Sequence, residues 1–404
     1  MTLEEAGITQ NTRFNVEETN AVSNSDSESV GDDFRDAPSS PTRSPDPQYE
    51  SLKQKCERIR DNLLQEKTVL VRRETLIEDV LDAYRANEGL EHHNVRMKIE
   101  GEPALDVSGV KCEVYSMFFM QVFLLCFVGN LEVMPEMNPE FICSDLFVLI
   151  GRIMAHAFVL VGYFPIRLCK AAMITMITGS CSAEVVMSSF LSYVSASQRA
   201  VIQKTTQNDP LSCQEKLVLF SLFNDFGMTR TPERQNFKDC VYKVAEMCCI
   251  YRSLGAMGKI CQGIEVYPGF WTSVKESDIN ELYHSMRPTV PGVLSRIKYK
   301  FSDHSITLRC AEERIKEYLE IFIEDHIGDL GLPKLLQYWT ASNILVVPTL
   351  HVSFTSQEGA GRCPFVNSCI AQLNLSRMFV SCEEFVHEFK FYLNSREAQE
   401  FDSI

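Results

Sequence analysis

The chain has 404 residues, with 39 Lys and Arg against 54 Asp and Glu, so its formal net charge is -15. Apolar residues make up 45% of the sequence and charged residues 23%, as in a soluble globular protein that is large enough to bury substantial cores. The acidic charge repels phosphate backbones and the basic residues are scattered, which argues against nucleic acid as a partner.

Cysteine and histidine usage indicates the compartment and argues against bound metals. The fifteen cysteines lack the paired CxxC spacing of zinc sites, and no secretory signal opens the sequence. Both features favour a reducing compartment, the cytoplasm or the nucleus. The histidines are isolated apart from His92-His93, and nucleotide, dinucleotide and serine-hydrolase motifs are absent, so the sequence predicts neither a metal nor a cofactor.

Residues 1–50 are predicted to form a disordered, acidic, Ser/Pro-rich tail, because eleven acids and few apolar side chains cannot offset the entropy of ordering. Residues 51–67 begin a helical lead-in. Apolar positions from Gln48 to Tyr84 indicate helices that we expect to dock onto the following domain, since the apolar seam is too short for a coiled coil. Alternating Val95, Met97 and Ile99 then predict a strand.

The middle of the chain, residues 110 to 300, is mostly helical by its periodicity. Two apolar runs, residues 114 to 128 and 146 to 165, superficially resemble membrane spans. The second run carries Arg152 and His156, and one charge at the centre of a span costs about 2.5 to 3.5 kcal/mol. We therefore expect buried helices and no membrane as a partner.

The last hundred residues differ from the middle of the chain because their pattern predicts both strands and helices. Residues 311–327 predict an amphipathic helix with Ile315, Leu319, Phe322 and Ile323 on one face. Strands are expected at 350–354 and 370–375, and a further helix at 383–393. The sequence thus predicts an α+β protein, with a small α/β unit behind a large, mainly helical one.

Cys369 is the candidate nucleophile. Any one cysteine is more often a small buried apolar residue than a nucleophile, so its context must distinguish it. Cys369 follows a Gly-containing loop and precedes an expected strand. At such a junction a thiol can be exposed while its backbone is held, as a covalent carrier requires.

The block around Cys369 resembles the catalytic lobe of HECT-type ubiquitin ligases, in a divergent form. The family pattern Leu-Leu-x-Phe-x-Thr-Gly corresponds to residues 335–341, and Leu-Pro-x-x-x-Thr-Cys-Phe-x-x-Leu-x-Leu to residues 363–375. Ser368 replaces the usual Thr and keeps a hydroxyl, Ile370 replaces the Phe, and Ala341 replaces the Gly. Phe401 stands four residues from the end of the chain, as a family Phe does, and residues 101–110 and 147–157 match the amino-terminal lobe more loosely.

The resemblance implies a bilobal fold with an N-lobe at residues 68–300, a hinge at 301–308 and a catalytic C-lobe at 309–404. It places a platform for the conjugating enzyme at about residues 186–245. Six apolar side chains there are interpreted either as an exposed groove or as ordinary core: Phe190, Leu191, Tyr193, Phe220, Leu222 and Phe223.

The resemblance also implies an activity, that of a ubiquitin-protein transferase. Cys369 would accept ubiquitin as a thioester from a ubiquitin-conjugating enzyme and pass it to a lysine of protein substrates, with Ser368 and Phe401 as further site residues. The alternative is a catalytically inactive HECT-like scaffold that binds ubiquitin or a conjugating enzyme. A helical adaptor acting through residues 48–84 is a third class, which leaves the block around Cys369 unexplained.

Overall fold

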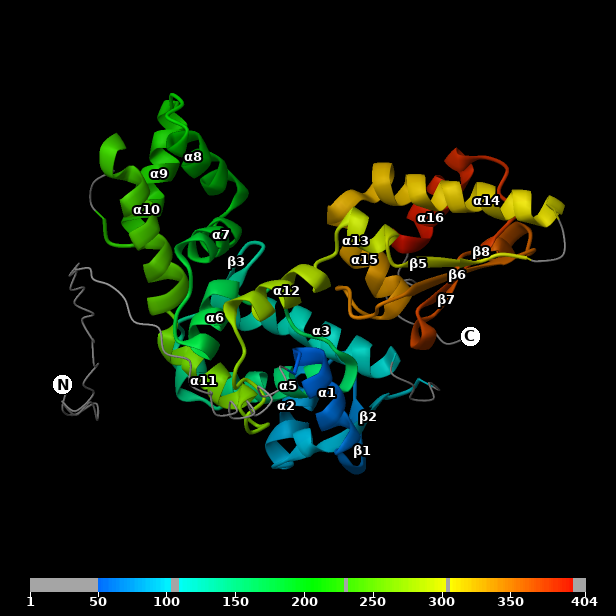
Figure 1. Ribbon diagram of the computed structural model, residues 1–404, viewed down its shortest axis with the longest axis horizontal. Coiled ribbons are helices and arrows are strands. Elements are labelled where there is room, and N and C mark those ends of the chain that lie inside the picture. Colours follow the sequence, from blue (N-terminus) through cyan, green and yellow to red (C-terminus); the bar gives the residue numbers. More distant parts are fainter. Residues whose placement is uncertain (1–49, 103–108, 229–231, 303–305, 395–404) are drawn as a thin grey trace, which may run out of the picture. The chain divides into compact units, whose positions relative to one another are not determined.

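The computed structural model describes residues 50–102, 109–228, 232–302 and 306–394 (Figure 1). The predicted tail lies outside the described residues except for Glu50. The buried apolar side chains form two clusters, an N-terminal core that extends from Cys56 to Met286 and includes Ile344, and a C-terminal core that extends from Val293 to Leu393. The α+β class predicted from the sequence is confirmed.

The N-terminal core is built mainly from helices. Its elements are, in chain order, α1 Leu52–Asp61, β1 Leu64–Val71, α2 Leu76–Ala86, η2 Leu90–His92, β2 His93–Ile99, α3 Gly109–Cys126, β3 Phe127–Gly129, β4 Val133–Pro135, α4 Pro139–Cys143, α5 Leu146–Val161, α6 Lys170–Thr178, α7 Ala183–Tyr193, α8 Ala196–Thr206, α9 Cys213–Asp225, η3 Arg234–Asn236, α10 Phe237–Glu246, the π-helical turn η4 Met247–Tyr251, α11 Leu254–Ile264 and α12 Glu276–Met286.

The first helices and strands correct one expectation from the sequence. The stretch expected to be helical up to Tyr84 is interrupted by strand β1, which pairs in parallel with β2. The first residues of β1 are exposed on both faces, so the alternation that marks a strand is present only in its second half. Helix α1 docks onto the N-terminal core, where the Lys55 Nζ donates hydrogen bonds to the carbonyl oxygens of Phe270 and Thr272 at 2.8 and 2.7 Å.

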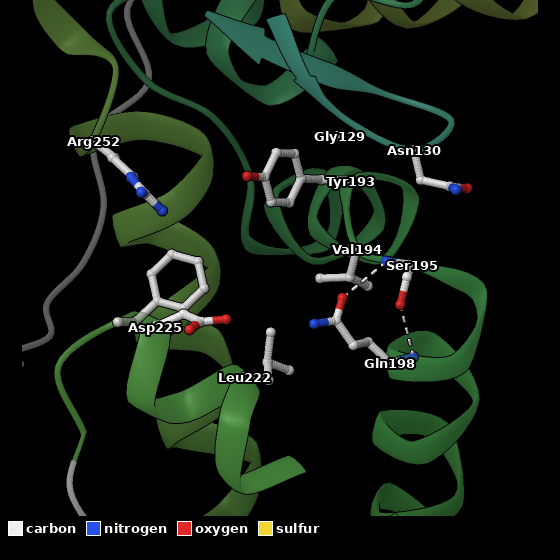
Figure 2. Close-up of a pocket in the computed structure, with 10 residues that line it drawn as sticks. Gly129, Asn130, Tyr193, Val194, Ser195, Gln198, Leu222, Asp225 and Arg252 are labelled. Carbon is white, nitrogen blue, oxygen red and sulfur yellow. Dashed lines mark hydrogen bonds between the residues drawn. The ribbon is translucent and has the colours of Figure 1, made fainter. Parts of the chain in front are cut away.

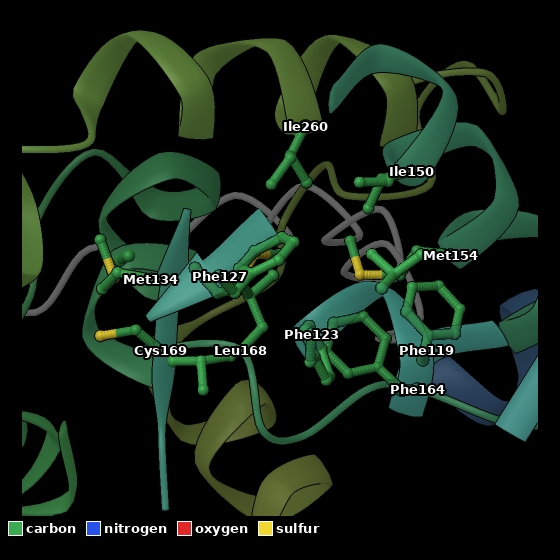
Figure 3. Close-up of a cluster of buried hydrophobic side chains, with 14 of the residues drawn as sticks. Phe119, Phe123, Phe127, Met134, Ile150, Met154, Phe164, Leu168, Cys169 and Ile260 are labelled. Carbon is green, nitrogen blue, oxygen red and sulfur yellow. The ribbon is translucent and has the colours of Figure 1, made fainter. Parts of the chain in front are cut away.

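The two apolar runs form the central helices α3 and α5. Among the described residues α3 alone is long and apolar enough to cross a membrane, and 61% of that stretch is buried inside the protein. Figure 3 shows Phe119 and Phe123 of α3 beside Ile150 and Met154 of α5 in the N-terminal core. Several of the aromatic rings in this core pack edge to face, as Phe123 and Phe127 do. The runs therefore have the burial expected of core helices.

A buried polar network ties α2, α3 and α5 together. The Tyr84 hydroxyl lies 2.6 Å from His156 Nδ1 and 2.9 Å from the Tyr115 hydroxyl, while His156 Nε2 lies 3.0 Å from the carbonyl oxygen of His93. All three side chains are fully buried. Burial lowers the pKa of His156 to about 3, because the protonated imidazole would lose its hydration.

We expect this histidine to make the protein less stable in mild acid. Between pH 6.5, the ordinary pKa of the imidazole, and about pH 3, the unfolded chain binds a proton that the native state excludes, so stability falls as the pH falls. The slope from this group reaches about 1.4 kcal/mol per pH unit. Urea unfolding at several pH values should show that the free energy of unfolding depends less steeply on pH in His156→Gln than in the wild type. His284→Gln, on the exposed face of α12, is the control, and equal slopes for both variants would contradict the expectation.

The C-terminal unit is a four-stranded sheet with helices packed on it (Figure 1). The strand order is β5-β6-β8-β7; β5, β6 and β8 run parallel, and β7 is antiparallel to β8. Its elements are α13 Val290–Leu294, β5 Ile297–Lys300, α14 Ile306–Ile321, the π-helical turn η5 Phe322–Ile327, α15 Gly328–Thr340, β6 Leu350–Thr355, η6 Gly359–Arg362, β7 Phe365–Asn367, η7 Ser368–Ile370, β8 Gln372–Ser376 and α16 Cys382–Asn394.

The chain crosses from the N-terminal core to the C-terminal core at an earlier position than the segment 301–308, which was expected to be the hinge. Met286 belongs to the N-terminal core, whereas Val293 and strand β5 belong to the C-terminal unit, so the chain passes between the cores at residues 287–289. The expected segment 301–308 lies within the C-terminal unit. Its Ser302 donates hydrogen bonds from the backbone and the hydroxyl to the Glu312 carboxylate at 2.8 and 2.6 Å, and residues 303–305 lie outside the described residues.

Candidate active site

Cys369 lies on a tight turn that joins two antiparallel strands. The 3-10 turn η7 connects β7 to β8, and the Ala371 N–H closes it by donating to the Ser368 carbonyl oxygen at 3.2 Å. Ala371 adopts a left-handed backbone conformation with φ of 49°, which directs the chain into β8. The turn holds Cys369 half-buried and Ile370 exposed, so the thiol is presented from a fixed backbone.

The C-terminal core anchors this turn from beneath. The carbonyl oxygen of Ala371 accepts hydrogen bonds from Trp339 Nε1 and from the His351 backbone N–H, both at 2.9 Å. Trp339 is fully buried near the end of α15. Because helix and sheet hold the same carbonyl, the position of Cys369 depends on the packing of the whole C-terminal unit.

The turn also contacts the amino-terminal end of α3. A Cβ atom placed on Gly109 would lie 2.7 Å from Ser368 Oγ and 3.3 Å from Cys369 Sγ, so a larger residue there would force these two side chains to shift. Ser368 and Cys369 line a cleft of about 510 Å³ together with Gly109, Cys112 and residues of α1. The start of α3 is itself fixed, because the buried Glu113 pairs with Arg73 at 2.9 Å.

The predicted site residues are placed as follows. Ser368 and Cys369 are adjacent at the cleft, and Phe401 lies outside the described residues. Neither His351 nor His387 of the C-terminal unit lines this cleft; both side chains are exposed, and His387 borders a separate hollow beside Arg362.

The other two cysteines of the C-terminal block are also half-buried. Cys363 precedes β7, and Cys382 begins α16. Burial raises the pKa of the Cys382 thiol, and the nearby Glu383 carboxylate adds to the effect. A raised pKa leaves less thiolate at neutral pH, so Cys382 is a poorer nucleophile than an ordinary cysteine.

A second pocket, of about 270 Å³, lies in the region expected as the platform (Figure 2). It is formed where the β3–β4 turn, the α7–α8 junction, α9 and the end of η4 meet, and it is lined by Tyr193, Leu222, Asp225 and Arg252 among others. Burial raises the pKa of Tyr193 to about 12. The Arg252 guanidinium lies 5.7 Å from the centre of the Phe226 ring, and the lining combines the buried Leu222 with the exposed, charged Asp225 and Arg252.

The six apolar side chains expected on the platform do not form one exposed groove. Phe190, Leu222 and Phe223 are buried in the N-terminal core, as the alternative interpretation held. Leu191 and Tyr193 are half-buried, and only Phe220 is exposed. The groove interpretation was wrong for most of these residues because successive turns of α7 and α9 direct them inward.

Sequence reasoning missed the residues of α3 that face the C-terminal unit, namely Gly109, Cys112 and Ser116. Their spacing of three and four positions places them on one side of the helix. That side bears small residues, while the rest of α3 is rich in large apolar ones. Small residues at this spacing could have indicated a close contact, but hydropathy alone does not reveal it.

The described residues contain no cluster of three or more metal-binding side chains. Comparison with models of known protein families finds no match, and no curated protein matches the sequence. The function therefore has to be argued from the residues and from the geometry around Cys369.

Proposed function

We propose that this chain is a HECT-type ubiquitin-protein transferase in which Cys369 carries ubiquitin as a thioester. The observation that supports it best is the position of Cys369 on a rigid turn at a cleft, in a C-terminal unit with its own core. A carrier thiol needs a fixed backbone, which η7 provides, and a side chain that is not fully buried, which Cys369 has at this cleft. The resemblance of residues 335–341 and 363–375 to the family agrees with this placement.

The chemistry requires two successive acyl transfers. The Cys369 thiolate attacks the carbonyl carbon of the ubiquitin thioester, a new C–S bond forms, and the thiolate of the conjugating enzyme leaves. A substrate amine then attacks the same carbon, an amide bond forms, the amine proton passes to solvent, and Cys369 leaves as thiolate. The first exchange is nearly isoenergetic, so the protein's main task is to position the reacting groups.

The pocket of Figure 2 is the surface that we assign to the conjugating enzyme. Exposed apolar side chains flank it, with Val128 and Leu131 on the β3–β4 hairpin and Tyr251 at the end of η4. The charged Asp225 and Arg252 line it and are exposed. An apolar anchor surrounded by charged groups is a common arrangement at protein interfaces.

This assignment requires Cys369 to move. Cys369 lies at the amino-terminal end of α3, whereas the pocket begins at Gly129, just beyond its carboxyl end. The 18 residues of α3 span about 25 Å at a rise of about 1.5 Å per residue. The C-terminal unit must therefore swing on residues 287–289 to bring Cys369 to a bound conjugating enzyme.

The experiment that tests the proposal is incubation of the full chain with a panel of ubiquitin-charged conjugating enzymes, followed by non-reducing electrophoresis. We expect a ubiquitin adduct that thiol reagents release. Binding of ubiquitin or of a conjugating enzyme without any adduct across the panel would instead favour the scaffold.

Phe401 provides a separate prediction that follows from the resemblance. If its ring docks only while the thioester is presented to a lysine, its energy lowers the barrier of the second transfer alone. Phe401→Ala should form the Cys369 thioester at the normal rate but discharge it to lysine about tenfold more slowly, equivalent to about 1.4 kcal/mol. Single-turnover discharge is the measurement, and discharge at the wild-type rate would remove Phe401 from the site.

A further inference from the structure

One face of α3 is joined to the C-terminal unit along its first two turns. Gly109 contacts the η7 turn, the Cys112 thiol lies beside the Ser342 side chain, and Ser116 meets the end of α15. Gly109, Cys112 and Ser116 share one side of the helix because they are three and four residues apart. We call these residues, with their partners in the C-terminal unit, the α3 seam.

Ser116 is the polar centre of the α3 seam. Its hydroxyl lies 2.9 Å from Gln337 Oε1 and 3.1 Å from Asn343 Oδ1, and it accepts a hydrogen bond from the Asn343 backbone N–H at 3.2 Å. The Tyr163 hydroxyl of the N-terminal core also donates to Asn343 Oδ1, at 3.3 Å. Ser116 is fully buried, so a substitution that removes the hydroxyl leaves polar groups of the C-terminal unit without their partner.

The α3 seam directs the thiol of Cys369 toward the protein's own N-terminal core. The backbone of Gly109 is in contact with the turn, and α1 forms another wall of the cleft. A small molecule can enter a cleft of about 510 Å³, which is far smaller than a folded conjugating enzyme.

We infer that the α3 seam is an autoinhibitory latch: while it is closed, Cys369 is withheld from the conjugating enzyme, and opening the seam controls charging. The control of charging rests on the proposed function, whereas the limited access to the Cys369 thiol does not depend on it. Opening exchanges the contacts of Gly109, Cys112 and Ser116 for solvent and withdraws Ile344 from the N-terminal core, while the remaining buried residues of each core keep their packing. Substitutions in the seam therefore speed charging, in contrast to the usual effect of altering a catalytic region.

Labelling of Cys369 by thiol reagents of two sizes tests the latch in the full chain without ubiquitin. Iodoacetamide reports access for small molecules, and maleimide on a protein-sized polyethylene glycol reports access for a partner. All proteins in this experiment carry serine in place of the exposed Cys143, Cys213 and Cys310. Labelling of Cys369 is then the difference between the labelling of each protein and that of the same protein with Cys369→Ser.

Two substitutions open the seam. Gly109→Ala places a Cβ against Ser368, and Ser116→Ala removes the polar centre. Each should raise the rate of polymer labelling about tenfold or more, equivalent to about 1.4 kcal/mol, with little change for iodoacetamide. Gly258→Ala is the matched control, because a Cβ there meets nothing within 4 Å.

A third variant closes the seam and keeps the test decisive if the first two fold poorly. Ser342→Cys places a second thiol beside Cys112, and mild oxidation should join them across the seam. The oxidised variant should label with polymer more slowly than the wild type, and reduction should restore the rate. Polymer labelling that is the same in the opened, locked and wild-type proteins would overturn the latch.

The same variants separate the latch from the transferase. With charged conjugating enzymes, Gly109→Ala and Ser116→Ala should acquire ubiquitin faster than the wild type, and the locked variant more slowly. Changed labelling with no ubiquitin adduct in any variant would refute the proposed function and leave the latch. Normal charging with unchanged labelling would refute the latch alone.

Discussion

Cys369→Ala is expected to abolish the ubiquitin thioester completely, because no other described thiol combines exposure at a cleft with a backbone held on the η7 turn. Cys369→Ser should give either no adduct or an oxyester that survives thiol reagents, since the serine hydroxyl is a much weaker nucleophile at neutral pH. The measurement is adduct formation from a charged conjugating enzyme on non-reducing gels, before and after addition of thiol.

Two neighbouring cysteines are the matched controls for this result. Cys363 and Cys382 lie in the same unit and are half-buried like Cys369, but they precede β7 and begin α16 instead of standing on the turn. Cys363→Ser and Cys382→Ser should keep a normal thioester. A thiol-sensitive adduct that persists in Cys369→Ala would refute the assignment of the nucleophile, whatever the two controls show.

Much of the C-terminal unit could be predicted from the sequence, because its elements have one buried and one exposed face. The expected face of α14 and η5, with Ile315, Leu319 and Phe322, is fully buried. Strands β6 and β8 and helix α16 occur close to their expected positions. The loop-to-strand position of Cys369 was predictable for the same reason, since turn residues and alternation mark the ends of strands.

The divergent positions of the resemblance have identifiable structural consequences. Ala341, where the family has Gly, caps α15 in a left-handed conformation with φ of 60°. A glycine adopts this conformation without strain, whereas an alanine pays a small backbone cost. The chain makes this turn with an alanine, and Asn343 beyond it reaches Ser116.

The contacts between the units could not be predicted, because they depend on small and polar residues that carry no hydropathy signal. Gly109, Cys112 and Ser116 lie on a helix whose apolar residues are distributed almost all round, so periodicity does not single out a face. The position at which the chain passes between the cores, residues 287–289, could not be predicted for a different reason. The short helix α13 and strand β5 follow it, and β5 pairs with β6, which lies some fifty residues later in the chain.

The largest effect on stability is expected at the crossing of α5 and α11, where Gly151 meets Gly263. A Cβ on Gly263 would lie 2.2 Å from the Val148 carbonyl oxygen and 2.7 Å from Gly151 Cα, and a Cβ on Gly151 would lie 2.1 Å from the Ile260 carbonyl oxygen. These neighbours are backbone atoms of two core helices, so no side-chain rotation can relieve the clash and the helices must separate.

Gly263→Ala should therefore destabilise the protein by about 3 kcal/mol or more, at the upper end for overpacking, although alanine favours helix intrinsically. Gly258→Ala, five residues earlier on α11 with nothing within 4 Å of its Cβ, should be neutral or slightly stabilising. Urea unfolding of both variants is the measurement. Because Gly151 and Gly263 share one contact, the double alanine variant should lose less than the sum of the single losses. Equal stability of Gly263→Ala and Gly258→Ala would mean that α5 and α11 do not approach this closely, and the placement of Arg152 and His156 on α5 would then have to be revised.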